Sequence, residues 1–314
     1  MQRVRLEDLG PRAWPTPVVT VGNFDGVHVG HRALVERTVS EARSAGGTAV
    51  VLTFDPHPAR VLAPDRAPGA LTTPAQKEEL LGGLGVDRLV IVPFTPELAA
   101  RSPEAFVADV LVGAVGARIV VVGESFRFGH RQAGDVKRLS ALGAEMGFAV
   151  RALAPVLWDG SPVSSSRVRE ALKAGDVEAA RALLGRSHFV DGLVVRGDGR
   201  GKGIGVPTAN LEPENEVVPG GGVYAGRCRL PDGAERIAVV NVGQRPTFGG
   251  EGITVEAHLL DFEGDLYGAH VRLSFHERLR GERRFAGQEA LVAQIRLDVE
   301  RARTLVSAAG DEKV

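Results

Sequence analysis

Two histidines stand three residues apart in the segment GNFDGVHVGH, residues 22–31. His28 and His31 follow a short apolar run at 18–21 and stand where a helix is expected to begin, so their side chains share one helix face. The unpaired N–H groups and the positive dipole end of a helix N-terminus bind anions, and two imidazoles beside them suit a polyphosphate. The flanking glycines permit close approach of the backbone to such a ligand: Gly22, Gly26 and Gly30.

The same two histidines allow two other interpretations. Their spacing suits a pair of metal ligands, but no third Cys, His or carboxylate ligand is placed to complete such a site. They are also compatible with solvated side chains on a surface helix. The preceding apolar run and the surrounding glycines make a phosphate site the favoured hypothesis.

Two further segments fit a phosphate ligand. VVGESFRFG, residues 121–129, again carries an apolar run into a loop flanked by glycines. Ser164-Ser165-Ser166 precedes Arg167 and Arg169 at the expected start of another helix, which combines hydroxyl caps with guanidinium groups. Serine caps and surface arginines are common, so each segment alone is weak evidence for a ligand site. The phosphates of one bound nucleotide would account for all three segments together.

A second glycine-rich segment, GDGRGKGIGVPTAN, occupies residues 197–210. It is not a P-loop, because Gly201-Lys202 is followed by Gly203 rather than by Ser or Thr. A flexible loop between strands is the simplest interpretation. Against it, Thr208 and Asn210 present a hydroxyl and an amide oxygen, which Mg²⁺ accepts together with substrate phosphates.

The strand-like segment TVEAHLL, residues 254–260, contributes a carboxylate. Alternation along a strand places Thr254, Glu256 and His258 on one face, opposite the apolar residues. Glu256 is then either an ordinary solvated residue or a general base for a substrate hydroxyl, if a nucleotide lies across the sheet.

These residues need a scaffold, and continuous apolar runs separated by helical segments supply one in the first part of the chain. The runs lie at 18–21, 49–54, 89–92 and 119–122, with helical segments at 32–45 and 73–84. Such alternation predicts a parallel sheet covered on both faces. Ligands of these sheets bind beyond the carboxyl ends of the strands, where the glycine-flanked loops follow.

The pattern changes after Arg186. Short alternating strands such as 189–195, and a hairpin signal at Pro231-Asp232-Gly233, predict a small antiparallel barrel or sandwich. One helix is expected at 168–184 before the change, and the expected domains are 1–186 and 187–314. An amphipathic helix closes the chain, with this apolar face: Leu291, Ile295, Val299, Ala302 and Leu305.

Composition excludes several classes of protein. The 314 residues carry 38 basic and 39 acidic side chains and are 44% apolar, which excludes a disordered chain and argues against a nucleic-acid partner. No apolar run approaches a membrane span, and the N-terminus has no secretory pattern. The single cysteine, Cys228, excludes an internal disulfide and indicates a reducing compartment, so we expect a cytoplasmic protein without a membrane partner. Transient self-association stays open.

The motifs of the first part resemble a known family. GNFDGVHVGH, TFDPHP (53–58), GESFRFG and SSSRVR (164–169) occur in the order found in the FMN adenylyltransferase module of bacterial bifunctional FAD synthetases. This resemblance spans about residues 15–185 and implies an α/β nucleotidyltransferase domain with a Rossmann-like parallel sheet. It implies ATP binding by these residues: Gly22, Asn23, Phe24, Asp25, Gly26, His28, His31, Ser164, Ser165 and Arg169.

The resemblance also implies a flavin side to the first site. The matching residues are Phe54, Asp55, Pro56, His57, Ser125, Phe126 and Phe128. The sequence departs from the family pattern at Ser125, where Asp or Asn is frequent, and at Ser166, where Thr is frequent. The implied reaction is in-line attack of the FMN phosphate on the α-phosphorus of ATP, with release of pyrophosphate. The phosphate is already a nucleophile, so the catalytic work given to His28, His31, Arg169 and Mg²⁺ is alignment and neutralisation of charge.

The second part resembles riboflavin kinase over about residues 187–306. The motifs are GRGKGIGVPTAN, GVYAG (222–226), NVGQRPTF (241–248), VEAHLLDF (255–262) and LRGERRF (279–285). The resemblance implies Mg²⁺ at Thr208 and Asn210, and activation of the riboflavin 5′-hydroxyl by Glu256. Val206 stands where Phe is common. The implied ATP-binding residues are Gly199, Gly201, Lys202, Gly203, Gly205, Pro207, Thr208 and Asn210.

Together the two resemblances predict a bifunctional transferase that phosphorylates riboflavin to FMN and then adenylylates FMN to FAD, with ATP as co-substrate and Mg²⁺ as cofactor. The alternatives are a chain that keeps only one activity and a non-catalytic flavin-binding regulator. A fragment of a class I aminoacyl-tRNA synthetase shares H-x-G-H, but the balanced charge and the lack of a K-M-S-K-S match argue against it.

Overall fold

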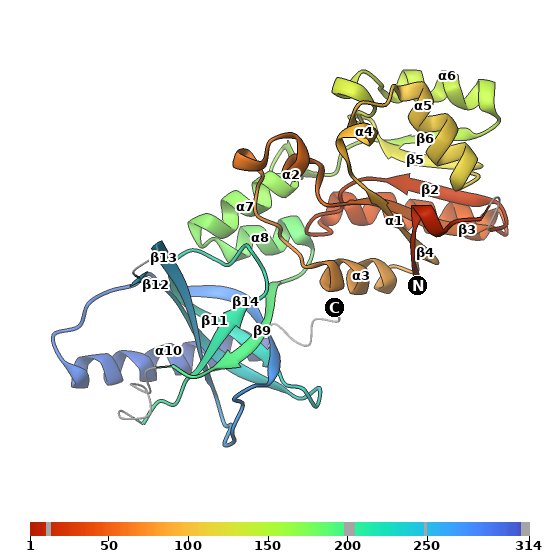
Figure 1. Ribbon diagram of the computed structural model, residues 1–314. Coiled ribbons are helices and arrows are strands. Elements are labelled where there is room, and N and C mark those ends of the chain that lie inside the picture. Colours follow the sequence, from red (N-terminus) through yellow and green to blue (C-terminus); the bar gives the residue numbers. More distant parts are fainter. Residues whose placement is uncertain (11–13, 198–204, 248–249, 309–314) are drawn as a thin grey trace. The chain divides into compact units, whose positions relative to one another are not determined.

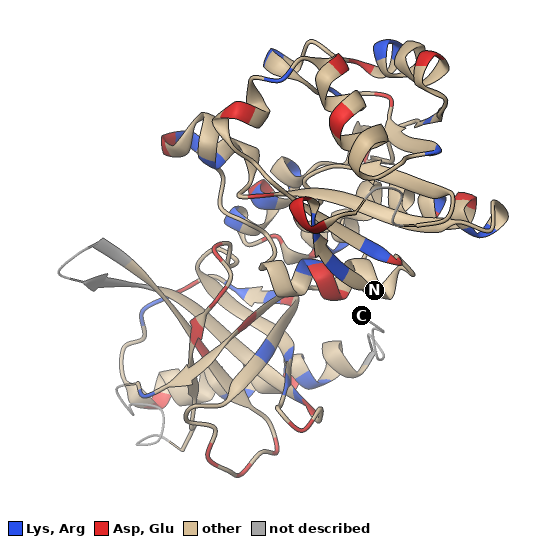
Figure 2. Cartoon of the chain, turned by 45° about the vertical axis from the view of Figure 1, so that its right-hand side comes forward, with Lys and Arg blue, Asp and Glu red and all other residues tan. Residues whose placement is uncertain are grey.

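The computed structural model describes residues 1–10, 14–197, 205–247 and 250–308, and within these ranges it describes the side chains of all residues except 244–251 and 308 (Figure 1). The chain forms two compact units. The first comprises Met1–Gly69 and Pro74–Val163, and the second comprises Ala70–Thr73 and Ser164–Val314. Basic and acidic residues are interspersed over the helices and strands of each unit (Figure 2).

Six parallel strands form a sheet in the described part of the first unit, in the order β1-β4-β3-β2-β5-β6. Their bounds are β1 Gln2–Arg5, β2 Pro17–Val21, β3 Thr48–Asp55, β4 Arg88–Pro93, β5 Ile119–Gly123 and β6 Ala149–Leu153. Strands β3 and β4 follow on one side of β2, and strands β5 and β6 follow on its other side, so the order of strands reverses between β2 and β5. The carboxyl ends of β2 and β5 therefore flank the position where parallel sheets bind ligands.

Alternate residues of the central strands enter two separate cores, which explains their continuous apolar sequence. In β3, Val50 and Leu52 share one core with residues of α5 (Pro103–Phe106) and α6 (Val136–Met146), whereas Val51 shares the other with residues of α1 (Val29–Ser44) and α3 (Pro74–Gly83). The parallel α/β sheet expected from the sequence is thereby confirmed. The helical segments of this unit are η1 Leu6–Asp8, α1 Val29–Ser44, α2 Pro58–Leu62, η2 Pro64–Arg66, α3 Pro74–Gly83, α4 Pro96–Ala99, α5 Pro103–Phe106, the π-helix η3 Val107–Ala114, η4 His130–Gln132 and α6 Val136–Met146. A short hairpin pairs β7 Leu157–Trp158 with β8 Ser161–Pro162.

The second unit is built on a closed antiparallel barrel, in the order β10-β13-β12-β11-β14-β9 over the residues described. The strands are β9 His188–Val195, β10 Ala209–Pro213, β11 Gly222–Arg229, β12 Glu235–Thr247, β13 Gly250–Leu259 and β14 His270–Arg280. The terminal helix α10 (Gln288–Ala308) buries Ala302 and Val306 against Val223 and Val239 of the barrel wall. Of the two architectures expected for this part, the barrel is the one that forms.

Two helices stand where the sequence analysis expects one at 168–184. Helix α7 (Ser165–Ala174) ends at Gly175, which has a left-handed φ of +75°, and α8 (Val177–Leu184) begins after it. A Cβ at Gly175 would lie 2.7 Å from the Tyr224 hydroxyl oxygen, so glycine permits both the reversal and the close approach of β11. The expectation of a single helix was wrong because that turn residue was overlooked.

Helices α7 and α8 pack on the barrel. The Arg278 backbone N–H in β14 donates to Glu178 Oε1 at 3.2 Å, and its guanidinium donates to the Ala174 carbonyl at 3.2 Å. The second compact unit consequently starts at Ser164, whereas the expected domain boundary is 186–187. The short stretch Ala70–Thr73 also joins this unit, where Asn215 Nδ2 donates to the Leu71 carbonyl at 3.2 Å.

Candidate active sites

The histidine pair lies at the start of α1, directly beyond the carboxyl end of β2. His28 is the N-cap, and its Nδ1 accepts a hydrogen bond from the backbone N–H of His31 at 3.2 Å. The two rings stack with centroids 3.6 Å apart. A Cβ at Gly30 would lie 3.2 Å from the His28 ring, so glycine leaves the space that this ring needs.

Burial affects the two histidines of this pair. His28 is only 5% exposed, so the alternative of two solvated histidines does not describe it. Burial lowers the pKa of His31 well below its usual value, and the neighbouring His28 and Lys77 lower it further. Nδ1 of His31 is buried and has no hydrogen-bond partner among the residues described.

The turn that leads into the histidines has an unusual backbone. Phe24 and Val27 have left-handed φ values of +48° and +42°, a conformation uncommon for residues other than glycine. Two donors meet at one carbonyl oxygen of this turn, that of Asn23: Thr53 Oγ1 at 3.2 Å and Lys77 Nζ at 2.8 Å. Strained turns of this kind persist where the surroundings hold them and are typical of ligand sites.

An aromatic cavity of about 790 Å³ opens at the same edge of the sheet. Three of the residues expected on the flavin side line it: Phe54, Phe126 and Phe128. The rings of Phe126 and Phe128 stack at 5.4 Å, and Phe94 meets Phe54 edge to face at 5.6 Å. A flat apolar ring system would fit between such side chains.

The other residues expected on the flavin side do not line this cavity: Asp55, Pro56, His57 and Ser125. His57 caps α2 instead, where its Nδ1 accepts from the Ala59 backbone N–H at 3.1 Å. Ser125 is exposed.

Sequence reasoning missed several residues of the cavity wall. Phe94 directly follows the apolar run of β4, so its position at the carboxyl edge of the sheet was a usable signal. Arg127 and Arg131 also line the cavity, and Arg131 has a left-handed φ of +50°.

The serine–arginine segment opens α7. Ser164 is the N-cap and accepts from the Arg167 backbone N–H at 3.3 Å, Ser165 is the first helical residue, and Arg169 follows one turn later. This segment belongs to the second compact unit, and the histidine pair belongs to the first.

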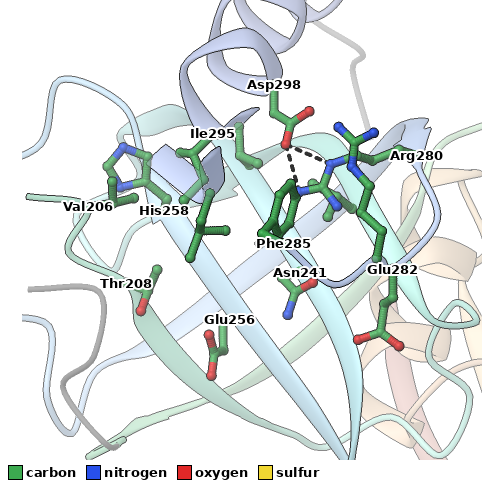
Figure 3. A pocket seen from close by; sticks show the side chains of 14 residues that line it. Val206, Thr208, Asn241, Glu256, His258, Arg280, Glu282, Phe285, Ile295 and Asp298 are labelled. Atoms are coloured by element: carbon green, nitrogen blue, oxygen red, sulfur yellow. Dashed lines mark hydrogen bonds and ion pairs between the residues drawn. The ribbon is translucent and has the colours of Figure 1, made fainter. Parts of the chain in front are cut away.

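A second cavity, of about 350 Å³, lies between the barrel wall and α10 (Figure 3). Thr208, Glu256 and Asn241 line it in neighbouring positions, as Figure 3 shows. In the strand register Glu256 of β13 stands directly opposite Asn210 of β10 on one side and Asn241 of β12 on the other. Directly opposed residues point to the same face of a sheet, so a carboxylate and two amides form one polar row.

The opposite wall of this cavity is held by a buried ion pair. Asp298 of α10 is 1% exposed and accepts from Arg280 Nε at 2.9 Å and from Gln294 Nε2 at 2.8 Å. The Arg280 and Arg283 guanidinium groups lie 5.5 Å and 5.2 Å from the Phe285 ring centre. Asn241 and Asp298 were not singled out from the sequence, although Asn241 opens the motif NVGQRPTF.

Part of the glycine track expected to bind ATP lies outside the described residues: Gly199, Gly201, Lys202 and Gly203. Gly205 is described and has a left-handed φ of +77°. The Pro207 carbonyl accepts a hydrogen bond from His258 Nδ1 at 2.8 Å, which fixes the backbone beside Thr208. This bond ties the end of the track to the strand that carries Glu256.

The donor set at Thr208 and Asn210 suits Mg²⁺, which takes few protein oxygens and completes its shell with water and phosphate. Across the described ranges, no three His, Cys, Asp or Glu side chains gather as a metal-binding group. In those same ranges no helix is both long enough and apolar enough to span a membrane.

Comparison with known proteins identifies the family of both units. A family model described as FAD synthetase matches residues 11–167, and one described as riboflavin kinase matches residues 184–306. A bifunctional riboflavin kinase/FMN adenylyltransferase of Pseudomonas fluorescens is 40% identical over 291 residues, which cover 92% of this chain and 93% of that protein. This chain belongs to the bifunctional riboflavin kinase/FMN adenylyltransferase family.

Two further comparisons also cover nearly the whole of this chain. The bifunctional riboflavin kinase/FMN adenylyltransferase of Escherichia coli K12 is 39% identical and covers 91% of each chain. A Streptococcus pneumoniae crystal structure titled a macrolide-efflux protein superimposes with a TM-score of 0.88 at 30% identity, covering 96% of this chain and 99% of that one. Both family resemblances drawn from the motifs are thereby confirmed.

Proposed function

We propose that this chain makes FMN from riboflavin and ATP on its barrel, and FAD from FMN and ATP on its parallel sheet. One observation carries the proposal. Each unit has a cavity that lies next to side chains suited to one of the two reactions. The barrel cavity adjoins the polar row of Asn210, Glu256 and Asn241. The sheet cavity opens beyond the same strand ends that lead to His28 and His31. We assign riboflavin phosphorylation to residues 187–314 and adenylyl transfer to residues 1–186.

In the kinase reaction the riboflavin 5′-hydroxyl attacks the γ-phosphorus of ATP, and its proton must go to a base. Glu256 is our candidate because it lines the cavity next to Thr208. Thr208 and Asn210 would hold Mg²⁺, which supplies charge neutralisation to the phosphates when bound. Asn241, directly opposite Glu256 in the register, would orient the carboxylate or the hydroxyl.

In the adenylyl transfer the FMN phosphate attacks the α-phosphorus of ATP, and pyrophosphate leaves. Because His28 Nδ1 accepts a backbone N–H, a neutral His28 carries its proton on Nε2, which is then a donor for a phosphate oxygen. The N-terminus of α1 adds backbone donors. We give Ser164, Ser165 and Arg169 a phosphate-binding role on the strength of the family motif.

The flavin ring of FMN would occupy the aromatic cavity lined by Phe54, Phe126 and Phe128. Four other residues do not line this cavity, and their proposed contact with the flavin rests on the family resemblance alone: Asp55, Pro56, His57 and Ser125. The single, buried Cys228 supports a reducing compartment, and we propose the cytoplasm.

The test is incubation of the purified protein with riboflavin, ATP and Mg²⁺, with FMN and FAD separated by chromatography over time. We expect FMN to form first and FAD to follow. Accumulation of FMN without FAD, even when FMN is supplied, would restrict the function to the kinase. FAD from added FMN, with no FMN from riboflavin, would restrict it to the adenylyltransferase.

A further inference from the structure

Lys77 is a basic residue near the histidine pair, and neither proposed reaction uses it. Of the 38 basic residues only five are lysines, and Lys77 is one whose ammonium bonds to the turn before His28. It belongs to α3, which packs under β3 and β4. Burial lowers the pKa of Lys77, and the carboxylates of Asp25 and Asp55 oppose that shift. A buried ammonium is stabilised by carboxylates and hydrogen-bond acceptors around it, and its acceptor in the turn is a backbone carbonyl.

The ammonium is attached to the backbone of the turn. Lys77 Nζ donates to the Asn23 carbonyl oxygen at 2.8 Å, and Thr53 Oγ1 donates to the same oxygen at 3.2 Å. Asn23 precedes Phe24, whose left-handed backbone starts the turn toward His28. The two donors therefore hold the one peptide group at which the chain leaves β2 for the phosphate site.

The charge of Lys77 also acts on the histidines. It contributes to the lowered pKa of His31, after burial and the neighbouring His28. Lysine suits this position better than arginine, because a compact ammonium can bind one carbonyl where a planar guanidinium requires a wider set of acceptors.

We propose that Lys77 is a positioning residue for adenylyl transfer: it holds the Asn23 carbonyl and thereby the turn that presents His28 to the phosphates of ATP. This rests on the assignment of adenylyl transfer to the first unit. Lys77 acts through the turn, and Thr53 shares the same task from the neighbouring strand.

The test compares Lys77→Met with Thr53→Val and with the double variant. Loss of a hydrogen bond from a charged donor predicts that Lys77→Met lowers kcat/KM for ATP in FAD formation about 10- to 100-fold. Thr53→Val should lower the same quantity less. Because both donors serve one oxygen, the double variant should lose less than the product of the two single losses.

Two controls separate this role from general damage. Lys137→Met removes an exposed lysine from α6 of the same unit and should leave both activities unchanged. FMN formation from riboflavin should be unchanged in every variant. Trp14 and Trp158, the two tryptophans of the chain, lie in the first unit, so their fluorescence reports whether that unit is folded.

A folded Lys77→Met protein with the parent's kcat/KM for ATP overturns the proposal, and so do strictly multiplicative losses in the double variant. If Lys77→Met does not fold, Thr53→Val decides alone: a selective loss in FAD formation supports the proposal, and the parent's rate overturns it. A parent protein that forms no FAD contradicts the assigned function instead, so the two failures are distinguishable.

Discussion

The imidazole rings of His28 and His31 stack with their centroids 3.6 Å apart and their planes 14° apart. Two protonated rings at this separation repel each other, and burial already lowers the pKa of His31. We therefore expect the pair to bind phosphate through hydrogen-bond donors rather than through two positive charges. On the proposed function, the positive charge that a polyphosphate requires must come from groups other than these two rings.

Asn241→Ala tests the polar row of the barrel. Asn241 stands opposite Glu256 and lines the same cavity, so loss of its amide should lower riboflavin phosphorylation about 10- to 100-fold through one lost polar interaction. Steady-state assays of FMN formation measure this. FAD formation from added FMN serves as the control and should keep its rate; an unchanged FMN rate would remove Asn241 from the site.

Phe126→Ala tests the aromatic cavity. Phe126 stacks on Phe128 in the cavity wall, and its removal takes contact area from the bound flavin. We expect the KM for FMN in FAD formation to rise about 10-fold, equivalent to about 1.4 kcal/mol of lost binding. The KM for riboflavin in the kinase reaction should not change. Equal shifts in both constants would indicate a general effect on folding.

Asp298→Ala tests the ion pair between α10 and β14. It leaves the partly buried Arg280 guanidinium without its carboxylate, which should destabilise the second unit by about 3 kcal/mol and raise the KM for riboflavin. The matched control is Asp261→Ala, which removes an exposed carboxylate paired with Arg303 of the same helix and should change neither quantity. Urea unfolding of the three proteins compares them directly.

His188 predicts a pH dependence of stability. Burial lowers the pKa of His188 from 6.5 to about 4, while its Nε2 bonds to the Val217 carbonyl and Arg186 lies nearby. Between pH 6.5 and 4 the unfolded chain binds a proton that the folded chain refuses, so the free energy of unfolding falls as the pH falls. Above pH 6.5 the group contributes no pH dependence.

The size of this effect follows from the shift, and amounts to about 2 kcal/mol between pH 7 and pH 5. Urea unfolding followed by circular dichroism measures it. His188→Gln can keep a donor for the Val217 carbonyl but does not titrate, so the difference between parent and variant isolates this group. Identical pH dependence in the two proteins would contradict the prediction.

Much of the sheet was predictable because four of its strands contain short apolar runs, of which those in β2 and β5 lead into glycine-flanked loops. The run 18–21 placed His28 and His31 at the sheet edge, and alternation placed Glu256 on the polar face of its strand. These features are local in sequence.

Other features depend on contacts between distant segments. Lys77 sits between Gln76 and two glutamates in an ordinary helical sequence, and only the packing of α3 on the sheet brings it to the Asn23 carbonyl. Asn241 becomes a neighbour of Glu256 through the register of β12 and β13, which no local pattern encodes. The ion pair between Arg280 and Asp298 likewise needs α10 to fold back on the barrel.

The central claim is that one chain carries two separate transferase sites, and complementation tests it most directly. His28→Ala should form FMN but no FAD, and Glu256→Gln should form FAD from FMN but no FMN from riboflavin. Mixed in equal amounts with riboflavin, ATP and Mg²⁺, the two variants should form FAD, because FMN made by one is used by the other. If either folded variant loses both activities, or if Glu256→Gln still phosphorylates riboflavin at the parent's rate, the two-site account is contradicted.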